Sequence, residues 1–126
     1  MTTKPAWSHL PNAKHIAAVL ADARKRPGAW DAARTAARGA ARRAAWDAAR
    51  DAAWDAAAWD AAWDAARGAA RGAVCGAIRA LIAWDSSADL LDCTPDVLRA
   101  IIDMASPPVC HQAALLLPYA IVRFGP

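Results

Sequence analysis

The sequence contains no glutamate, one phenylalanine, one tyrosine and only three cysteines, Cys75, Cys93 and Cys110. An odd number of widely spaced cysteines predicts no disulfide framework, so we expect a reducing compartment. The N-terminal segment lacks the apolar stretch of a signal peptide. The longest apolar run, residues 113–122, contains Pro118 and is shorter than the ~20 residues of a membrane span. These absences predict a soluble, cytoplasmic protein without a membrane partner.

Signals of catalysis are also scarce. Cys110-His111 is an isolated pair, and no spacing of Cys and His matches a zinc site. We expect no strands, and therefore no glycine-rich phosphate loop between a strand and a helix. All carboxylate side chains are aspartates, and five of the twelve recur along a regular stripe. The sequence therefore predicts a protein that is not an enzyme, with no catalytic residue, no metal ligand and no cofactor.

Alanine and tryptophan dominate what is present. The 126 residues are 57% hydrophobic, but alanine buries little area, so the seven tryptophans must supply much of the core. Fifteen Lys and Arg against twelve acidic residues give a net charge of +3, which alone does not indicate a nucleic-acid partner. The length predicts one domain.

A four-residue repeat of the type Ala-Trp/Arg-x-Ala runs through residues 29–83. Its second position carries Trp30, Arg34, Arg38, Arg42, Trp46, Arg50 and Trp54, and after an extra Ala57 it carries Trp59, Trp63, Arg67, Arg71, Cys75 and Arg79. Alanine strongly favours helix. Because four residues exceed one helical turn by about 40°, the pattern spirals and predicts short helices contacted on several sides. We expect breaks at Gly39, at Ala57 or near Gly68, with a π-bulge as the alternative at Ala57.

The flanking segments predict ordinary helices. A first helix follows Asn12 and is stopped by Pro27-Gly28. Thr94 and Pro95 are typical of a helix start, and an apolar helix over residues 109–122 should be kinked or shortened by Pro118. The predicted fold is all-α, a compact bundle of about five or six helices in a single domain. Its parts are an N-terminal helix and turn (1–28), the repeat helices (29–83) and C-terminal apolar helices (84–126).

The ladder of Trp and Arg has two interpretations. Arg50 lies four residues from both Trp46 and Trp54, so its guanidinium can stack on an indole, and such surfaces hold nucleobases. Alternatively, the tryptophans fill the core and Trp54→Ala unfolds the protein. The residues that we predict to bind a ligand or partner are Trp46, Arg50, Trp54, Trp59, Trp63, Arg67 and Arg71.

Charged and glycine positions predict close helix pairing. Aspartates stand four apart at positions 47, 51, 55, 60 and 64, between a basic patch of Arg34, Arg38, Arg42 and Arg43 and a second basic end. Like charges at this spacing are unfavourable, which favours pairing of the acidic stripe with a basic end over a solvated face. Gly68, Gly72 and Gly76 predict close approach of another helix, unless they end a helix.

The repeat from "RPGAWDAARTAARGAARRAAWDAARDAAWDAA", followed by "ALIAWDSSADLLDCTPDVLRAIIDMASPPVCHQAALLLPYAIV", resembles a group of small Ala/Trp/Asp-rich (WDAA-repeat) proteins of tailed phages and some bacteria. The resemblance covers roughly residues 26–122. It implies a phage setting, hence the cytoplasm of the host cell, and it assigns no catalytic residue.

We therefore expect a non-enzymatic phage-type binding protein that occupies or sequesters a host component. Two versions are an anti-defence inhibitor of a host defence protein and a sponge for a nucleotide signal such as a cyclic nucleotide. The first alternative is a structural protein that forms homo-oligomers through the Ala/Trp and Asp/Arg ladders. The second is a nucleic-acid-binding protein, which the acidic stripe disfavours because it repels phosphate.

Overall fold

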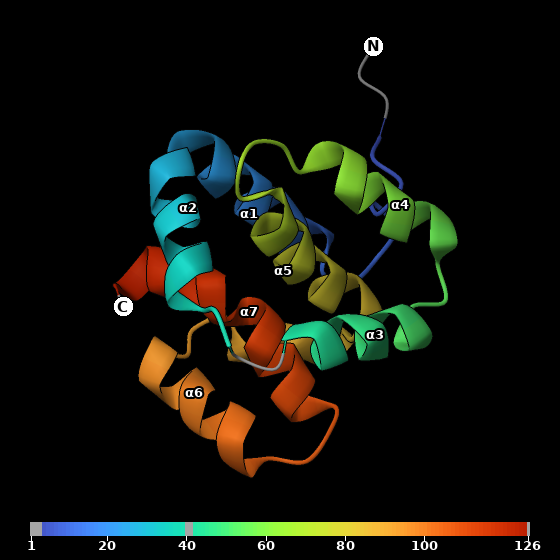
Figure 1. Cartoon of the computed structure of the whole chain (residues 1–126). Coiled ribbons are helices and arrows are strands. Elements are labelled where there is room, and N and C mark those ends of the chain that lie inside the picture. Colours follow the sequence, from blue (N-terminus) through green and yellow to red (C-terminus); the bar gives the residue numbers. More distant parts are fainter. Residues whose placement is uncertain (1–3, 40–41, 126) are drawn as a thin grey trace.

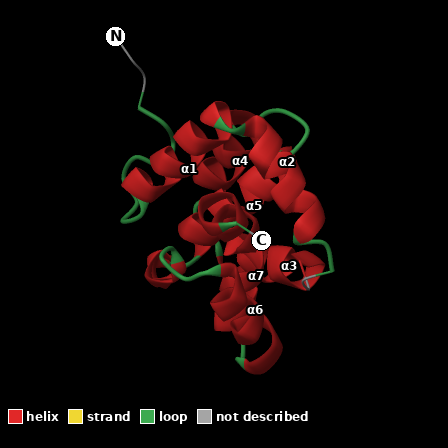
Figure 2. Cartoon of the chain, turned by 90° about the vertical axis from the view of Figure 1, so that its left-hand side faces the viewer, coloured by secondary structure: helices red, strands yellow, loops and turns green. Residues whose placement is uncertain are grey.

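The computed structural model describes residues 4–39 and 42–125, and it confirms the predicted all-α fold (Figures 1 and 2). The helices in these residues are α1 (Ala13–Lys25), α2 (Pro27–Ala36), α3 (Arg42–Ala52), α4 (Ala56–Ala65), α5 (Arg71–Ala83), the 3-10 helix η1 (Asp85–Leu90), α6 (Pro95–Met104) and α7 (Val109–Phe124). Their number exceeds the predicted five or six because the repeat breaks at or near all three predicted positions, Gly39, Ala57 and Gly68.

Three loops divide the repeat into short helices. Gly39 and Gly68 lie between helices with φ values of 90° and 92°, which glycine adopts without the strain that a side chain would bring. The middle loop falls just before Ala57, where the carboxylate of Asp55 accepts a hydrogen bond of 3.0 Å from the backbone N–H of Ala58. Asp55 thereby caps α4. The chain therefore breaks between Ala52 and Ala56, and the alternative of a continuous helix with a π-bulge at Ala57 is wrong.

Alanines form the buried side of the repeat helices. Each helix is short, so the drift of about 40° per repeat does not carry a four-residue ladder off the buried face. Each fully buried alanine of α3 and α4 directly precedes a Trp or Arg of the ladder: Ala45, Ala49, Ala58 and Ala62. Small side chains therefore face the core, and the bulky ladder positions lie beside it.

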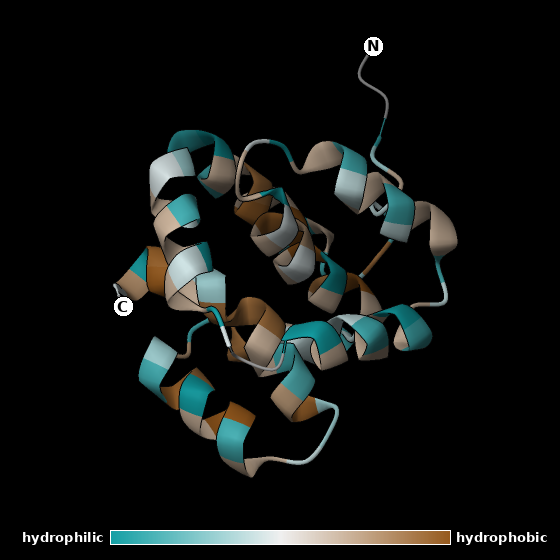
Figure 3. Ribbon diagram, in the orientation of Figure 1, coloured by the Kyte–Doolittle hydropathy of each residue, from teal (hydrophilic) through white to brown (hydrophobic). Residues whose placement is uncertain are grey.

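Helices α5 and α7 form the centre of the bundle. α5 contacts α1, α2, α3, α4 and η1, whereas α7 contacts α2, α3, α6 and η1, and the two contact each other. In Figure 3 the strongly hydrophobic colour appears along α7 and also on parts of α6. This arrangement confirms that the C-terminal segment closes the core against the repeat. Within the described ranges, no helix is both long and apolar enough to cross a membrane.

The predictions for the flanking helices are largely confirmed. Thr94 caps α6 by accepting the N–H of Val97, and Pro95 takes the first helical position. Pro27 follows the end of α1 and also begins α2. Pro118 does not shorten the last helix, because α7 continues past it to Phe124. Burial of Pro118 among the central helices outweighs the loss of one backbone hydrogen bond.

The glycine stripe serves two different purposes. A Cβ atom at Gly76 would lie 3.4 Å from Leu115 and 3.5 Å from the Trp46 indole, so this glycine permits close packing as expected. Gly72 has no neighbour within 4 Å of such an atom, and Gly68 shapes a loop. The prediction of a shared close-contact stripe is therefore correct for Gly76 alone.

Candidate functional site

Part of the Trp/Arg ladder assembles around Arg79 on α5. The guanidinium carbon of Arg79 lies 4.1 Å from the ring centroid of Trp59, 4.8 Å from that of Trp46 and 5.9 Å from that of Trp63. Trp46 and Trp59 meet edge to face, with centroids 6.3 Å apart. One cation therefore joins α3, α4 and α5, and we call Arg79 with these three tryptophans the Arg79 cluster.

Arg79 is buried, with 7% of its surface exposed. Its Nε and Nη2 atoms donate hydrogen bonds of 3.3 and 3.2 Å to the backbone carbonyl of Trp59. No ion pair within the described residues includes it. Burial lowers the pKa of Arg79, whereas Cys75 and Asp60 act to raise it. The cation is thus held by indole faces and a backbone dipole, without a carboxylate in contact.

The remaining ladder residues from α3 to α5 do not share one surface. Arg71 lies 5.0 Å from the Trp63 centroid and donates a hydrogen bond of 2.6 Å to the carbonyl of Ala66. Arg67 is exposed and borders a separate cavity of about 250 Å³ between α1 and the loop that precedes α5. Arg50 is exposed and lies 3.9 Å from Asp47. The cation–π contacts of the described residues use Arg71, Arg79 and Arg123, so the expected stacking of Arg50 does not occur.

Trp54 lies outside the Arg79 cluster. It is 77% exposed, because the chain leaves helical geometry after Ala52 and turns before α4. Its nearest aromatic neighbour is His9, whose ring lies edge to face at 6.4 Å. His9 Nε2 lies 2.6 Å from the carboxylate of Asp55. The expectation that Trp54→Ala unfolds the protein therefore no longer applies to this tryptophan.

The acidic stripe does not pair with the basic residues of the repeat as expected. Asp55 contacts His9 and caps α4, and Asp47 approaches Arg50 on its own helix. No ion pair within the described residues joins any aspartate of the stripe to the basic patch. Four of the five aspartates, Asp47, Asp51, Asp60 and Asp64, are exposed, so the stripe is largely solvated.

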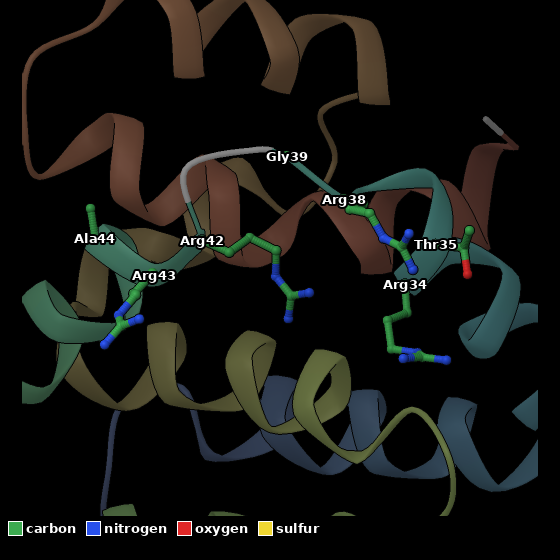
Figure 4. Close-up of a pocket in the computed structure, with 7 residues that line it drawn as sticks. All are labelled: Arg34, Thr35, Arg38, Gly39, Arg42, Arg43 and Ala44. Atoms are coloured by element: carbon green, nitrogen blue, oxygen red, sulfur yellow. The ribbon is translucent and has the colours of Figure 1, made fainter.

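The basic patch, in contrast, does assemble. One cavity of about 480 Å³ is lined by all four arginines of the patch, together with Thr35, Gly39 and Ala44. Arg34 belongs to α2, Arg38 to the turn after it, and Arg42 and Arg43 to the start of α3. We call this cavity the basic pocket. In Figure 4 the side chains of Arg34, Arg38 and Arg42 extend into the space beside the α2–α3 connection, and Arg43 borders it on the α3 side. The turn at Gly39 brings together arginines that a continuous helix would spread along its length.

The charges of the basic pocket are poorly compensated. Arg34 makes an ion pair of 3.0 Å with Asp31, whereas Arg38, Arg42 and Arg43 make none within the described residues. Arg42 is half-buried, and its Nε has no hydrogen-bond partner among the residues that the structure describes. Burial, and then the neighbouring charge of Arg34, lower the pKa of Arg42. An anion in the pocket would supply acceptors and opposite charge, and would relieve this repulsion.

The sequence predicted the four arginines as a patch but missed the role of Arg79. The missed signal is that Arg79 is the single charged residue between Val74 and Ala83 of α5, in a segment that is otherwise apolar. Such a position predicts a buried cation that needs aromatic or backbone partners. Cys75, one turn earlier, is fully buried, and burial raises its pKa to about 11, so it is a poor nucleophile. Among the described residues, no three His, Cys, Asp or Glu side chains are grouped to hold a metal ion.

Comparison with known proteins adds no assignment: no protein-family model, no curated protein and no solved structure matches this chain.

Proposed function

We propose that this chain is a non-enzymatic binding protein that captures a small phosphate-bearing ligand of the nucleotide class in the basic pocket. Of the expected functions, a sponge for a nucleotide signal is the version that such a pocket favours. The phage setting and the host cytoplasm are part of the same proposal, and they rest on the resemblance of the WDAA repeat.

The observation that carries this proposal is the set of four arginines in one cavity, of which only Arg34 has a carboxylate partner among the described residues. Guanidinium groups match phosphate oxygens in geometry and keep their charge at neutral pH. Their mutual repulsion makes the empty pocket electrostatically costly, so binding of an anion stabilises the fold. The cavity volume of about 480 Å³ lies within the usual range of roughly 300–1,000 Å³ for small-ligand sites.

Isothermal titration calorimetry tests the proposal. The panel contains inorganic phosphate, pyrophosphate, nucleoside mono- and triphosphates, cyclic mono- and dinucleotides and a short single-stranded oligonucleotide. The test variant is Arg38→Ala/Arg43→Ala, because both side chains are exposed and their loss should not disturb the core. The matched control is Arg24→Ala/Arg50→Ala, which removes the same charge from exposed positions outside the pocket.

We expect at least one nucleotide to bind, and the test variant to bind it at least tenfold more weakly. Each charge-assisted hydrogen bond contributes about 1.5–3 kcal/mol, and ~1.4 kcal/mol corresponds to a tenfold change in affinity. The control variant should retain the affinity of the wild type. If both variants lose the same affinity for the nucleotide, the effect comes from the overall charge of the protein and not from the pocket. If the oligonucleotide is the one ligand of the panel that binds, the result favours the nucleic-acid alternative. No binding by any member of the panel refutes the proposal.

A second candidate function is self-assembly, which an apolar face of α6 favours. Met104 is 84% exposed and Val97 is 47% exposed, and with Ala100, Ile101 and Ala105 they border a shallow apolar hollow of about 400 Å³. Exposed apolar patches of this kind often mark protein interfaces. Light scattering over a range of concentrations should then detect an oligomer that Met104→Lys dissociates. A monomer at all concentrations excludes this candidate.

A further inference from the structure

A second cavity adjoins the basic pocket. Its volume is about 260 Å³, and its walls come from the end of α2, from α6 and from α7. Arg38 and Gly39 belong to the walls of both cavities. The two cavities are therefore neighbours that meet at Arg38 and Gly39.

The second cavity differs in chemistry from the basic pocket. Its walls combine the half-buried side chain of Ile102 with the charged side chains of Arg38, Arg99 and Asp103. Ala37 and Leu117 also border the cavity, but each is only 1% exposed and offers almost no surface to a ligand. Ile102 therefore supplies the apolar surface on which a flat ring can pack.

Two charged residues on α6 determine which polar group fits. Arg99 has an ion-pair partner in Asp96, at 3.7 Å, whereas Asp103 has none within the described residues. A carboxylate accepts hydrogen bonds and donates none. Asp103 therefore favours an occupant that places a hydrogen-bond donor, and not a carbonyl oxygen, against its carboxylate.

We propose that the second cavity is a base-binding subsite, and that it selects nucleotides whose base carries an exocyclic amino group. This inference rests on the proposed function, because the phosphate must sit in the basic pocket. The amino group of adenine or cytosine donates to the carboxylate of Asp103, while the ring packs on Ile102. Uracil and hypoxanthine carry a carbonyl oxygen at the corresponding position and meet the carboxylate unfavourably.

The test compares matched nucleotides on the full chain by isothermal titration calorimetry. Cytidine and uridine 5′-monophosphate form one pair, adenosine and inosine 5′-monophosphate the other, and inorganic phosphate probes the basic pocket alone. We expect the amino-bearing member of each pair to bind about tenfold more tightly than its partner. Asp103→Ala should abolish this preference without weakening phosphate binding, since it removes a negative charge and lies on an exposed helix position.

The control variant is Asp89→Ala, which removes an equal charge from an exposed residue of η1 that borders neither cavity. It should keep the preference of the wild type. Equal affinities within both pairs for the wild type, or a preference that survives Asp103→Ala, would overturn the subsite while phosphate binding still supports the proposed function. If neither phosphate nor any nucleotide binds, the proposed function itself fails.

Discussion

Replacing Arg79 tests how much its buried charge, as opposed to the packing of its side chain, contributes to the stability of the fold. The guanidinium is surrounded by three indoles and donates two hydrogen bonds to the Trp59 carbonyl, and no carboxylate contacts it within the described residues. Two variants separate charge from volume. Arg79→Met removes the charge and keeps most of the side-chain volume, whereas Arg79→Ala removes both.

The terms that belong to the charge nearly cancel. Hydrogen bonds from a charged donor contribute about 1.5–3 kcal/mol, and desolvated cation–π contacts add about 2 kcal/mol. Burial of the cation costs several kcal/mol, in agreement with the lowered pKa of Arg79, whose largest cause is burial. The packing of the aliphatic stem against Trp46 and Trp59 then decides the outcome. We expect Arg79→Met to lower the free energy of unfolding by less than about 1 kcal/mol, and Arg79→Ala by about 3 kcal/mol.

Urea unfolding followed by tryptophan fluorescence and circular dichroism measures both values. Arg50→Ala, at an exposed arginine of the same repeat, is the control and should stay within about 0.5 kcal/mol of the wild type. If Arg79→Met destabilises the protein as much as Arg79→Ala, the charge itself holds the three helices together and the cancellation is wrong. If Arg79→Ala does not fold, the value for Arg79→Met still decides the question.

The remaining predictions concern Trp54, Trp30 and Asp55. Trp54→Ala should change the free energy of unfolding by no more than about 0.5 kcal/mol, because its indole is 77% exposed. Trp30→Ala should cost about 3–5 kcal/mol, because Trp30 is fully buried and stacks on Tyr119 at 5.6 Å. Thermal unfolding of the two variants checks this order, and an equal loss of stability would contradict it. Asp55→Ala should lower stability at pH 7, because hydrogen bonds from Ala58 and then His9 lower the pKa of Asp55. This contribution is present above the pKa of the unfolded carboxyl and is lost as the pH falls through the lowered value, so the difference from wild type should shrink below about pH 4. An undiminished difference at pH 3 would show that Asp55 acts without its charge.

The sites of the repeat breaks were largely predictable because their causes are local. Gly39 and Gly68 tolerate positive φ, and Asp55, two residues before the extra Ala57, caps the start of α4. Proline usually ends or shortens a helix, but α7 continues past Pro118, because burial in the centre of the bundle outweighs one missing hydrogen bond. Predictions from local chemistry fail where tertiary burial supplies the larger free energy.

The candidate site was predictable only in part. The basic patch was recognisable as a run of arginines, but its cavity exists because the turn at Gly39 brings the ends of α2 and α3 together. The sequence predicts that the acidic stripe pairs with basic residues, but the stripe is largely solvated, because four of its five carboxylates lie on exposed positions of α3 and α4. Asp103 showed no pattern in the sequence at all, since its place beside the basic pocket depends on how α6 packs against α2 and α7.

Residue propensity, helix capping and the period of four predict a helical chain whose repeat breaks into short helices, because all of these act over a few residues. That small alanines form the buried side of α3 and α4 follows from the tertiary structure. Which ladder residues contact one another depends on the tertiary structure. It placed Arg79 among three tryptophans and left Arg50 and Trp54 exposed, although all of them occupy the same position of the repeat. Identical local units acquire different roles because burial depends on the neighbours that each helix finds, and a repeating sequence cannot specify those neighbours within one unit.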